Sequence, residues 1–149
     1  MKEHSAEHLL ENATIRRAFR DALLESRPGT KTPIEQGGFI VRDAGTLRPV
    51  VRRLSVGQAD SFQIPMCPDG RFHGEEILGS FHTHPNTGPD WQEEPSRQDI
   101  RLVTEYPETV GPWHFVIGQA RTYCIANDGA VKILGATDDV LQIDFEDQS

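Results

Sequence analysis

The stretch Ile77-Leu78-Gly79-Ser80-Phe81-His82-Thr83-His84-Pro85 decides what fold and what chemistry to expect of this chain. Its apolar residues predict a strand from Ile77 to His84. Residues two apart in a strand share a face and lie roughly 6 to 7 Å apart along it, so His82 and His84 can turn both imidazoles toward one ion. His-x-His at a strand end is therefore a natural pair of metal ligands. The same spacing also occurs on solvated strand faces that bind nothing.

A third candidate ligand follows in Pro95-Ser96-Arg97-Gln98-Asp99, at the start of a helix predicted from Ser96 to about Tyr106. Ser-x-x-Asp is also typical of a capping box, in which Ser96 caps the helix and the acidic side chain reaches back to the cap amide. Capping and metal binding would compete for Asp99. Asp90, in the preceding loop, is the rival third ligand, and we favour Asp99.

The remaining pattern indicates an α+β fold, a single domain with a mixed sheet flanked by helices. An apolar stripe at helical spacing predicts one helix from Ser5 to about Ser26, which stops before Arg27-Pro28-Gly29. Asn127-Asp128-Gly129 is a strong hairpin signal between the last two strands. Besides the strand that ends at His84, the sequence predicts strands at Gly37 to Arg42, Thr46 to Val51, Trp113 to Ile117, Thr122 to Ala126 and Val131 to Leu134.

Length and composition are those of one soluble globular domain. The chain has 149 residues, within the usual range for one domain, and no apolar run approaches the length that crosses a bilayer. The N-terminus lacks the basic start and apolar core of a secretory signal, so we expect a cytoplasmic protein with no membrane partner. A formal net charge of −8 disfavours nucleic-acid binding, because the mean field repels phosphates. Cys67 and Cys124 are interpreted as reduced thiols.

Three glutamates are candidates for a proton carrier at such a site. Glu76 shares strand parity with His82, but six residues of extended chain would place it roughly 20 Å away. Glu75 would point to the opposite face if the strand extends that far. The geometry therefore favours a carboxylate from a neighbouring strand, and Glu35, just before the strand that starts at Gly37, is such a candidate.

Taken in chain order, Glu35, His82-Thr83-His84-Pro85 and Ser96-Arg97-Gln98-Asp99 resemble the motif of the JAMM/MPN-plus metalloprotease family, which has an upstream Glu, then His-x-His-Pro, then Ser-x-x-Asp. The placing is also similar, because the glutamate leads into a glycine-containing strand, the histidines end a strand and the aspartate opens a helix. The resemblance covers roughly residues 34–126. The spacer from Pro85 to Pro95 is about four residues longer than the family commonly shows, an extension that a loop absorbs at little entropic cost.

The resemblance implies an MPN-like, cytidine-deaminase-like mixed sheet, with an N-terminal helix and loop at 1–30, a metalloprotease core at 34–136 and an acidic C-terminal segment at 137–149. It implies one zinc ion per chain on His82, His84 and Asp99, with Glu35 as general acid and base and Ser96 stabilising the tetrahedral oxyanion. Three protein ligands leave the fourth tetrahedral position to water, which is the catalytic arrangement. The activity implied is hydrolysis of a peptide or isopeptide bond in a protein or peptide substrate, including removal of a ubiquitin-like modifier.

Two other interpretations stay open. MPN-like domains that lack the metal act as scaffolds or interaction modules, although a scaffold has no physical need for this whole set of residues. Alternatively, Asp90 or Cys67 closes a purely structural four-ligand site. The strand that runs from Gly37 is one candidate edge for binding an extended substrate tail. The oligomeric state is not predicted. The remaining histidines fit surface or interior positions better than ligand positions: His4, His8, His73 and His114.

Overall fold

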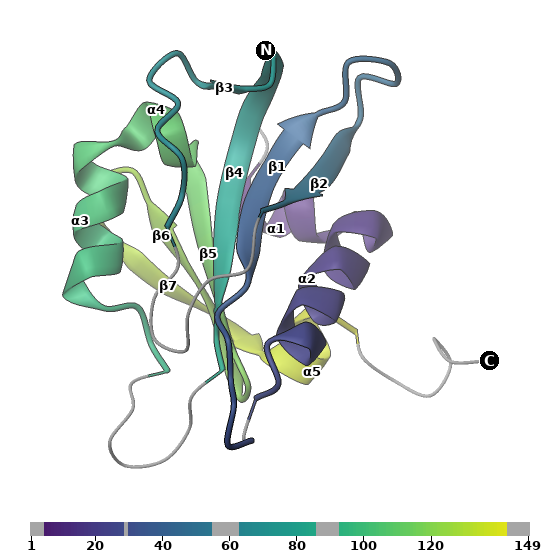
Figure 1. Ribbon diagram of the computed structural model, residues 1–149, viewed down its shortest axis with the longest axis vertical. Coiled ribbons are helices and arrows are strands. Elements are labelled where there is room, and N and C mark those ends of the chain that lie inside the picture. The colour runs from purple at the N-terminus through teal and green to yellow at the C-terminus, as the bar shows by residue number, and fades with distance from the viewer. Residues whose placement is uncertain (1–4, 29, 55–62, 86–92, 143–149) are drawn as a thin grey trace.

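The chain forms a seven-stranded mixed sheet with helices on both faces (Figure 1). The structure, a computed structural model, describes residues 5–28, 30–54, 63–85 and 93–142. The strand order is β2-β1-β4-β5-β6-β7, and β3 pairs with β4. The elements in chain order are α1 (Ala6–Leu10), α2 (Ala13–Glu25), β1 (Gly37–Arg42), β2 (Pro49–Arg53), β3 (Arg71–Phe72), β4 (Glu75–His84), α3 (Arg97–Glu105), α4 (Pro107–Val110), β5 (Trp113–Gly118), β6 (Arg121–Ala126), β7 (Val131–Ala136) and α5 (Thr137–Val140).

Strand β4 lies in the middle of the sheet. It pairs antiparallel with β1 and parallel with β5, whereas the other neighbouring strands pair antiparallel. His82 lies opposite Gly37 of β1 on one side and Val116 of β5 on the other. Because β1 pairs with β2 as well as with β4, the prediction that it offers a free edge to a substrate tail is wrong.

A β-bulge in β4 decides which face its side chains occupy. Ile40 of β1 lies opposite Gly79, but the next residue of β1 lies opposite Ile77, so Leu78 is the extra residue. Leu78 and Phe81, which are three residues apart, consequently pack into the same apolar cluster. The strand parity that related Glu76 to His82 therefore does not hold across the bulge, and Glu76 instead forms an ion pair with Arg42.

The two faces of the sheet carry separate apolar layers. In Figure 1, α1, α2 and α5 lie on one side of the sheet, and α3 and α4 on the other. The centre of the first layer is Phe19 of α2, whose ring centroid lies 4.5 Å from that of Phe81 and 5.4 Å from that of Phe115. The α2 residues that bury this face recur at helical spacing: Ile15, Phe19, Ala22 and Leu23. The second layer comprises Val103, Val110, Val116, Tyr123 and Ile125.

The N-terminal segment forms two helices, and the prediction of one continuous helix is wrong. The side chain of Asn12 accepts hydrogen bonds from the backbone N–H groups of Thr14 (2.8 Å) and Ile15 (3.2 Å), so it caps a new helix. Arg16 donates to the carbonyl oxygens of Leu10 and Glu11, both at 2.8 Å, which satisfies the end of α1. The apolar stripe runs across both helices and does not reveal the break.

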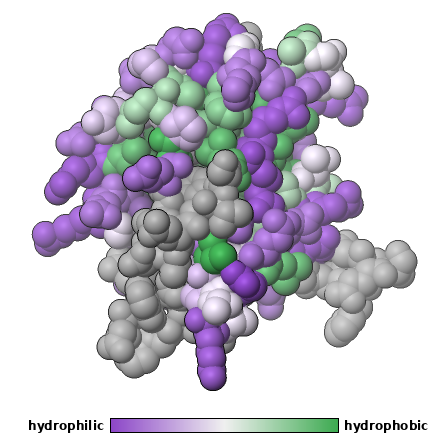
Figure 2. Space-filling model, in the orientation of Figure 1, coloured by the Kyte–Doolittle hydropathy of each residue, from purple (hydrophilic) through white to green (hydrophobic). Residues whose placement is uncertain are grey.

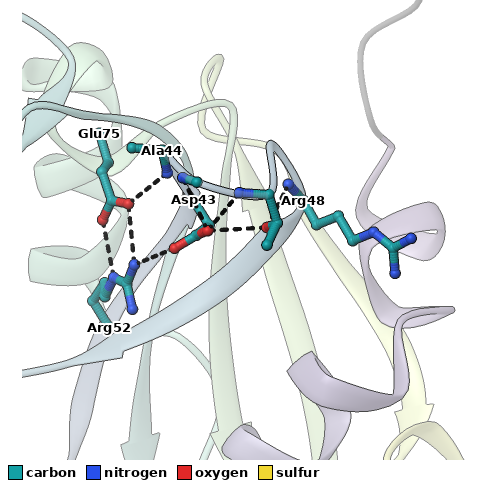
Figure 3. A network of polar contacts seen from close by, with 7 residues as sticks. Asp43, Ala44, Arg48, Arg52 and Glu75 are labelled. Carbon is teal, nitrogen blue, oxygen red and sulfur yellow. Dashed lines mark hydrogen bonds and ion pairs between the residues drawn. The ribbon is translucent and has the colours of Figure 1, made fainter.

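The second strand begins at Pro49 instead of Thr46 because an acidic side chain holds the preceding residues in a turn. The Asp43 carboxylate accepts hydrogen bonds from the backbone N–H and the hydroxyl of Thr46 (2.8 and 3.0 Å). Figure 3 shows Asp43 joined through Arg52 to Glu75, which also accepts a hydrogen bond from the Ala44 amide. This network fixes the β1–β2 turn against the start of β4. That strand begins at Glu75, two residues before the predicted start at Ile77.

The other predicted elements are confirmed with small changes at their ends. β1 has the predicted bounds, β5 to β7 extend by one or two residues, and the β6–β7 hairpin forms as expected. The sequence pattern did not indicate the short elements β3, α4 and α5. At the start of the acidic C-terminal segment, α5 precedes Leu141, which is buried in the first apolar layer.

Hydrophilic residues cover most of the described surface in the view of Figure 2. Within the described ranges, no helix has both the length and the apolar character needed to cross a membrane. Cys67 and Cys124 are both free and buried, in agreement with their interpretation as reduced thiols.

Candidate metal centre

The end of β4 brings the two predicted histidines together. His82 is buried and His84 half-buried on the same face of the strand. Their Nε2 atoms lie 2.9 Å apart. Two imidazole nitrogens that face each other at this distance are stable only when a proton or a cation lies between their lone pairs. The strand alone therefore preforms a two-nitrogen site.

The N-terminus of α3 places Asp99 against both histidines. Asp99 Oδ1 lies 3.3 Å from His82 Nε2, and Asp99 Oδ2 lies 3.3 Å from His84 Nε2. The capping box is also present, because Asp99 Oδ2 accepts from the Ser96 amide (2.8 Å) while Ser96 Oγ accepts from the Asp99 amide (3.1 Å). Capping and metal binding therefore do not exclude each other here, because one carboxylate completes the helix cap and also faces both imidazoles.

A backbone carbonyl orients the ring of His84. His84 Nδ1 lies 2.8 Å from the carbonyl oxygen of Glu93, which can only accept, so Nδ1 carries a proton and the neutral ring has its lone pair on Nε2. Glu93 is itself anchored, because its carboxylate accepts hydrogen bonds from the backbone N–H groups of Ala120 (2.7 Å) and Arg121 (3.0 Å). Gly118 makes room for this anchor, since a Cβ there would lie 2.1 Å from the Glu93 side chain.

Local charges favour an ionised carboxylate between the imidazoles. Burial alone would raise the pKa of Asp99, but the adjacent His82 and His84 hold it well below its usual range. Burial alone would lower the pKa of His84, but the hydrogen bond and charge of Asp99, together with the charge of Glu35, raise it. A negative oxygen ligand therefore faces two nitrogen ligands across a site that is largely closed to solvent.

These three side chains form a donor set that suits zinc. Among the described residues, they are the group of His, Cys, Asp and Glu side chains close enough to hold a metal ion, with ligand atoms within 4.8 Å of one another. Ligands of a tetrahedral zinc ion lie about 3.4 Å apart, given the usual zinc–ligand distances. The two Nε2 atoms are 2.9 Å apart, and the distance from each to its nearer Asp99 oxygen, Oδ1 for His82 and Oδ2 for His84, is 3.3 Å, which is close to this value. Two nitrogens and one carboxylate fit a zinc ion with an open fourth position.

Glu35 reaches the same end of the sheet from β1. The amide of Thr83 donates to the Gln36 carbonyl (2.8 Å), and the Gln36 amide donates to the Thr83 hydroxyl (2.9 Å), so the β1–β4 ladder continues beyond Gly37. Continued by one residue, this antiparallel register sets Glu35 beside His84. Glu35 is only 7% exposed, and its charge acts on His84.

The competing candidates lie elsewhere or outside the described residues. Cys67 packs with Ile77 near the start of β4, at the opposite end from the histidines. Glu75 is bound to Arg52. His8 and His73 are exposed, as expected for surface positions. Asp90 and His4 fall outside the described residues.

Sequence reasoning missed His114 as a neighbour of the site. It is fully buried in β5, and its Nε2 lies 2.7 Å from His82 Nδ1. Burial lowers the pKa of His114 to about 3, and the charge of His82 acts in the same direction. The available signal was a histidine inside the apolar strand Trp113 to Ile117, but only the strand order could show that it contacts His82.

Comparison with known families agrees with this geometry. The model of the family described as prokaryotic homologs of the JAB domain matches residues 13–129. The match includes the two histidines, Asp99, Ser96 and Glu35, and it also covers α2 and the β6–β7 turn. No match was found among curated proteins.

Proposed function

Because the chain belongs to the family of prokaryotic homologs of the JAB domain, we propose that it is a zinc-dependent hydrolase that cleaves a peptide or isopeptide bond. One observation carries this proposal. The Nε2 atoms of His82 and His84 lie 2.9 Å apart and each lies 3.3 Å from an oxygen of Asp99, while the charge of the buried Glu35 acts on His84. His82, His84 and Asp99 would hold the ion.

The chemistry divides between the ion and the side chains around it. Bound zinc supplies the Lewis acidity that activates a water molecule and polarises the scissile carbonyl. Glu35 accepts the proton of the attacking water and passes it to the nitrogen of the leaving amine. Its burial suits this role, because a carboxylate in a closed site keeps the proton from bulk solvent.

Ser96 would stabilise negative charge on the attacked carbonyl oxygen. Its Oγ accepts a hydrogen bond from the Asp99 amide through a lone pair. The hydroxyl proton is therefore still available to donate a hydrogen bond. A donor aimed at a developing oxyanion is worth about 2.7 to 4 kcal/mol of transition-state stabilisation. Ser96 therefore contributes to rate, whereas the three ligands decide whether the site binds metal at all.

The substrate that suits this site is a protein or peptide, including a ubiquitin-like protein joined through its flexible C-terminal tail. An extended tail would bind by adding a strand to a sheet edge. Among the described strands, β2 and β7 end the main strand order and the two-residue β3 pairs only with β4, whereas β1 is paired on both sides.

The test compares the zinc-loaded wild type with Glu35→Gln on a peptide library and on lysine-linked conjugates of ubiquitin-like proteins, with cleavage followed by mass spectrometry. Glu35→Gln should keep its zinc and lose roughly 10²- to 10⁴-fold in rate, the usual contribution of a general acid–base group. Glu76→Gln is the matched control, because Glu76 is exposed and forms an ion pair with Arg42. A zinc-loaded wild type that cleaves no better than Glu35→Gln would contradict hydrolysis and support the scaffold interpretation.

A further inference from the structure

A chain of buried polar groups extends from His82 into the sheet. The Ser80 hydroxyl donates to the Val110 carbonyl oxygen at 2.8 Å, Ser80 Oγ lies 2.7 Å from His114 Nδ1, and His114 Nε2 lies 2.7 Å from His82 Nδ1. Ser80 and His114 are both fully buried. Such groups lower stability unless each is hydrogen-bonded, so a connected chain of them calls for a specific explanation.

The parallel pairing of β4 and β5 creates this chain. Ser80 lies opposite His114, and His82 lies opposite Val116, two residues further along both strands. Ser80 and His82 share a face of β4, so the ring of His114 bridges them from the neighbouring strand. The ring centroids of His82 and His114 are 4.9 Å apart.

The hydrogen bonds in this chain have a fixed direction. A serine hydroxyl has one proton, and a carbonyl oxygen only accepts. Ser80 therefore donates a hydrogen bond to the Val110 carbonyl and can only accept one from His114. His114 Nδ1 must therefore carry a proton. Neither contact of His114 is an acidic side chain, so the buried ring is neutral and its Nε2 accepts. The proton between the two rings consequently belongs to His82 Nδ1.

We propose that Ser80 and His114 are positioning residues that hold His82 in the tautomer protonated on Nδ1, so that its Nε2 lone pair is presented to zinc. This inference rests on the proposed zinc site. Metal-binding histidines usually donate their second ring proton to a carboxylate, a backbone carbonyl or water. His84 follows that rule through the Glu93 carbonyl. His82 instead donates to the imidazole of His114, a group that can donate as well as accept. His114 accepts from His82 because its hydrogen bond to Ser80 fixes its own proton on Nδ1.

The variants separate the tautomer effect from packing. His114→Phe keeps a ring but removes the acceptor, and we expect zinc affinity to fall about 10- to 100-fold, the usual effect of losing such a partner. Ser80→Ala keeps both rings but releases His114 to donate toward His82, and it should also weaken zinc binding. His114→Gln restores an acceptor near the position of Nε2 and should recover most of the affinity.

Thr122→Val is the matched control. Thr122 is fully buried on β6, and its hydroxyl is paired with that of Thr137 at 2.8 Å. Its replacement removes a buried hydroxyl hydrogen bond of the same kind as that of Ser80, without contact to the histidines. Zinc affinity should therefore stay at the wild-type value.

Two measurements test the inference. The first is the zinc dissociation constant, by competition with a chromophoric chelator near neutral pH. The second is ¹⁵N NMR of the histidine rings in the metal-free protein, which identifies the protonated nitrogen. We expect His82 to carry its proton on Nδ1 in the wild type and His114→Gln, and to populate the Nε2-protonated form in Ser80→Ala.

The outcomes distinguish this inference from the proposed function. If the wild type binds zinc, but His114→Phe and Ser80→Ala bind it equally tightly with His82 still protonated on Nδ1, the positioning role is wrong and the zinc site stands. If the wild type binds no zinc, the proposed function fails, and the NMR result alone decides the tautomer. If His114→Phe does not fold, Ser80→Ala and His114→Gln carry the test.

Discussion

Asp99 shows how one side chain meets two demands at a helix start. Its carboxylate accepts a hydrogen bond from the Ser96 amide and lies against two imidazoles. Its own amide donates a hydrogen bond to the Ser96 hydroxyl oxygen. The cap fixes the first turn of α3, and with it the direction of the carboxylate. The Ser-x-x-Asp pattern therefore contributes to both helix formation and the candidate metal centre.

Ser96 offers the first test at this scale, because its cap and its hydroxyl proton can be separated. Ser96→Gly removes the donor but remains an acceptable cap, so it should lower kcat about 10²- to 10³-fold and stability by only a few tenths of a kcal/mol. Ser96→Thr keeps both functions and should retain most of the activity. Steady-state kinetics and urea unfolding measure the two effects. Wild-type kcat in Ser96→Gly would exclude the hydroxyl from catalysis.

Residue types and spacing, together with the motif resemblance, predicted His82, His84 and Asp99 as a group, because each belongs to a short local pattern. His114 could not be found in this way. Its contact with His82 joins residues 32 positions apart through the parallel pairing of β4 with β5. A lone histidine in an apolar strand is equally consistent with an ordinary interior position.

At the scale of elements, local side chain to backbone hydrogen bonds account for the main differences from the predicted boundaries. The Asn12 side chain starts a second helix within a continuous apolar stripe, and the Asp43 carboxylate holds Thr46 in a turn instead of a strand. Periodicity reports which face is buried, but it does not report where a capping side chain interrupts the backbone. Apart from the short β3, α4 and α5, the strands and α3 were predictable, whereas these two boundaries were not.

Replacing the cap tests the helix break. Asn12→Ala leaves the amides of Thr14 and Ile15 without their acceptor, and we expect a loss of about 1 kcal/mol in the free energy of unfolding. Thr14→Ala, on an exposed position of the same turn, should not lower stability. Urea unfolding followed by circular dichroism measures both. Equal stability of Asn12→Ala and wild type would show that the cap does not hold the start of α2.

The β1–β2 turn gives a prediction about pH. Hydrogen bonding to Arg52 lowers the pKa of Glu75, and hydrogen bonding to Thr46, with Arg52 contributing, lowers the pKa of Asp43. A lowered carboxyl pKa stabilises the fold above the unfolded value of about 4, and this stabilisation is lost as the pH falls through the folded value. Arg52→Met should therefore be less stable than wild type near neutral pH, and the difference should shrink as the pH falls below about 4.

Arg48→Met is the control for this pH effect, since the Arg48 side chain extends away from the network in Figure 3. Unfolding by urea at several pH values gives the comparison. If the deficit of Arg52→Met is the same at acidic and neutral pH, the ion pairs do not contribute and the loss comes from packing alone.

At the scale of the whole molecule, the sheet order assembles the site from segments far apart in sequence. β4 supplies the two histidines, α3 supplies Asp99, the entry to β1 brings Glu35, and β5 carries His114 behind His82. The motif resemblance predicted most of these partners. The sheet order, the bulge at Leu78 and the pairing of β1 on both sides depend on contacts between distant segments, which local pattern does not specify.

Zinc binding should stabilise the whole fold by linkage. A ligand that binds only the folded state at 100 times its dissociation constant adds about 2.7 kcal/mol to the free energy of unfolding. The midpoint temperature of thermal unfolding should therefore rise when zinc is added and fall back to the metal-free value when a chelator is added. His84→Ala should abolish the shift, and an unchanged shift in that variant would place the ion elsewhere.

The most direct test of the zinc centre is elemental analysis of the purified protein, prepared without a metal-binding tag, beside His84→Ala and Asp99→Asn. His8→Ala serves as a surface-histidine control, because His8 is exposed on α1. We predict about one zinc ion per chain in the wild type and the control, and loss of zinc in both site variants. A wild type without zinc under metal-replete conditions, or Asp99→Asn that keeps its zinc, would contradict the centre formed by His82, His84 and Asp99.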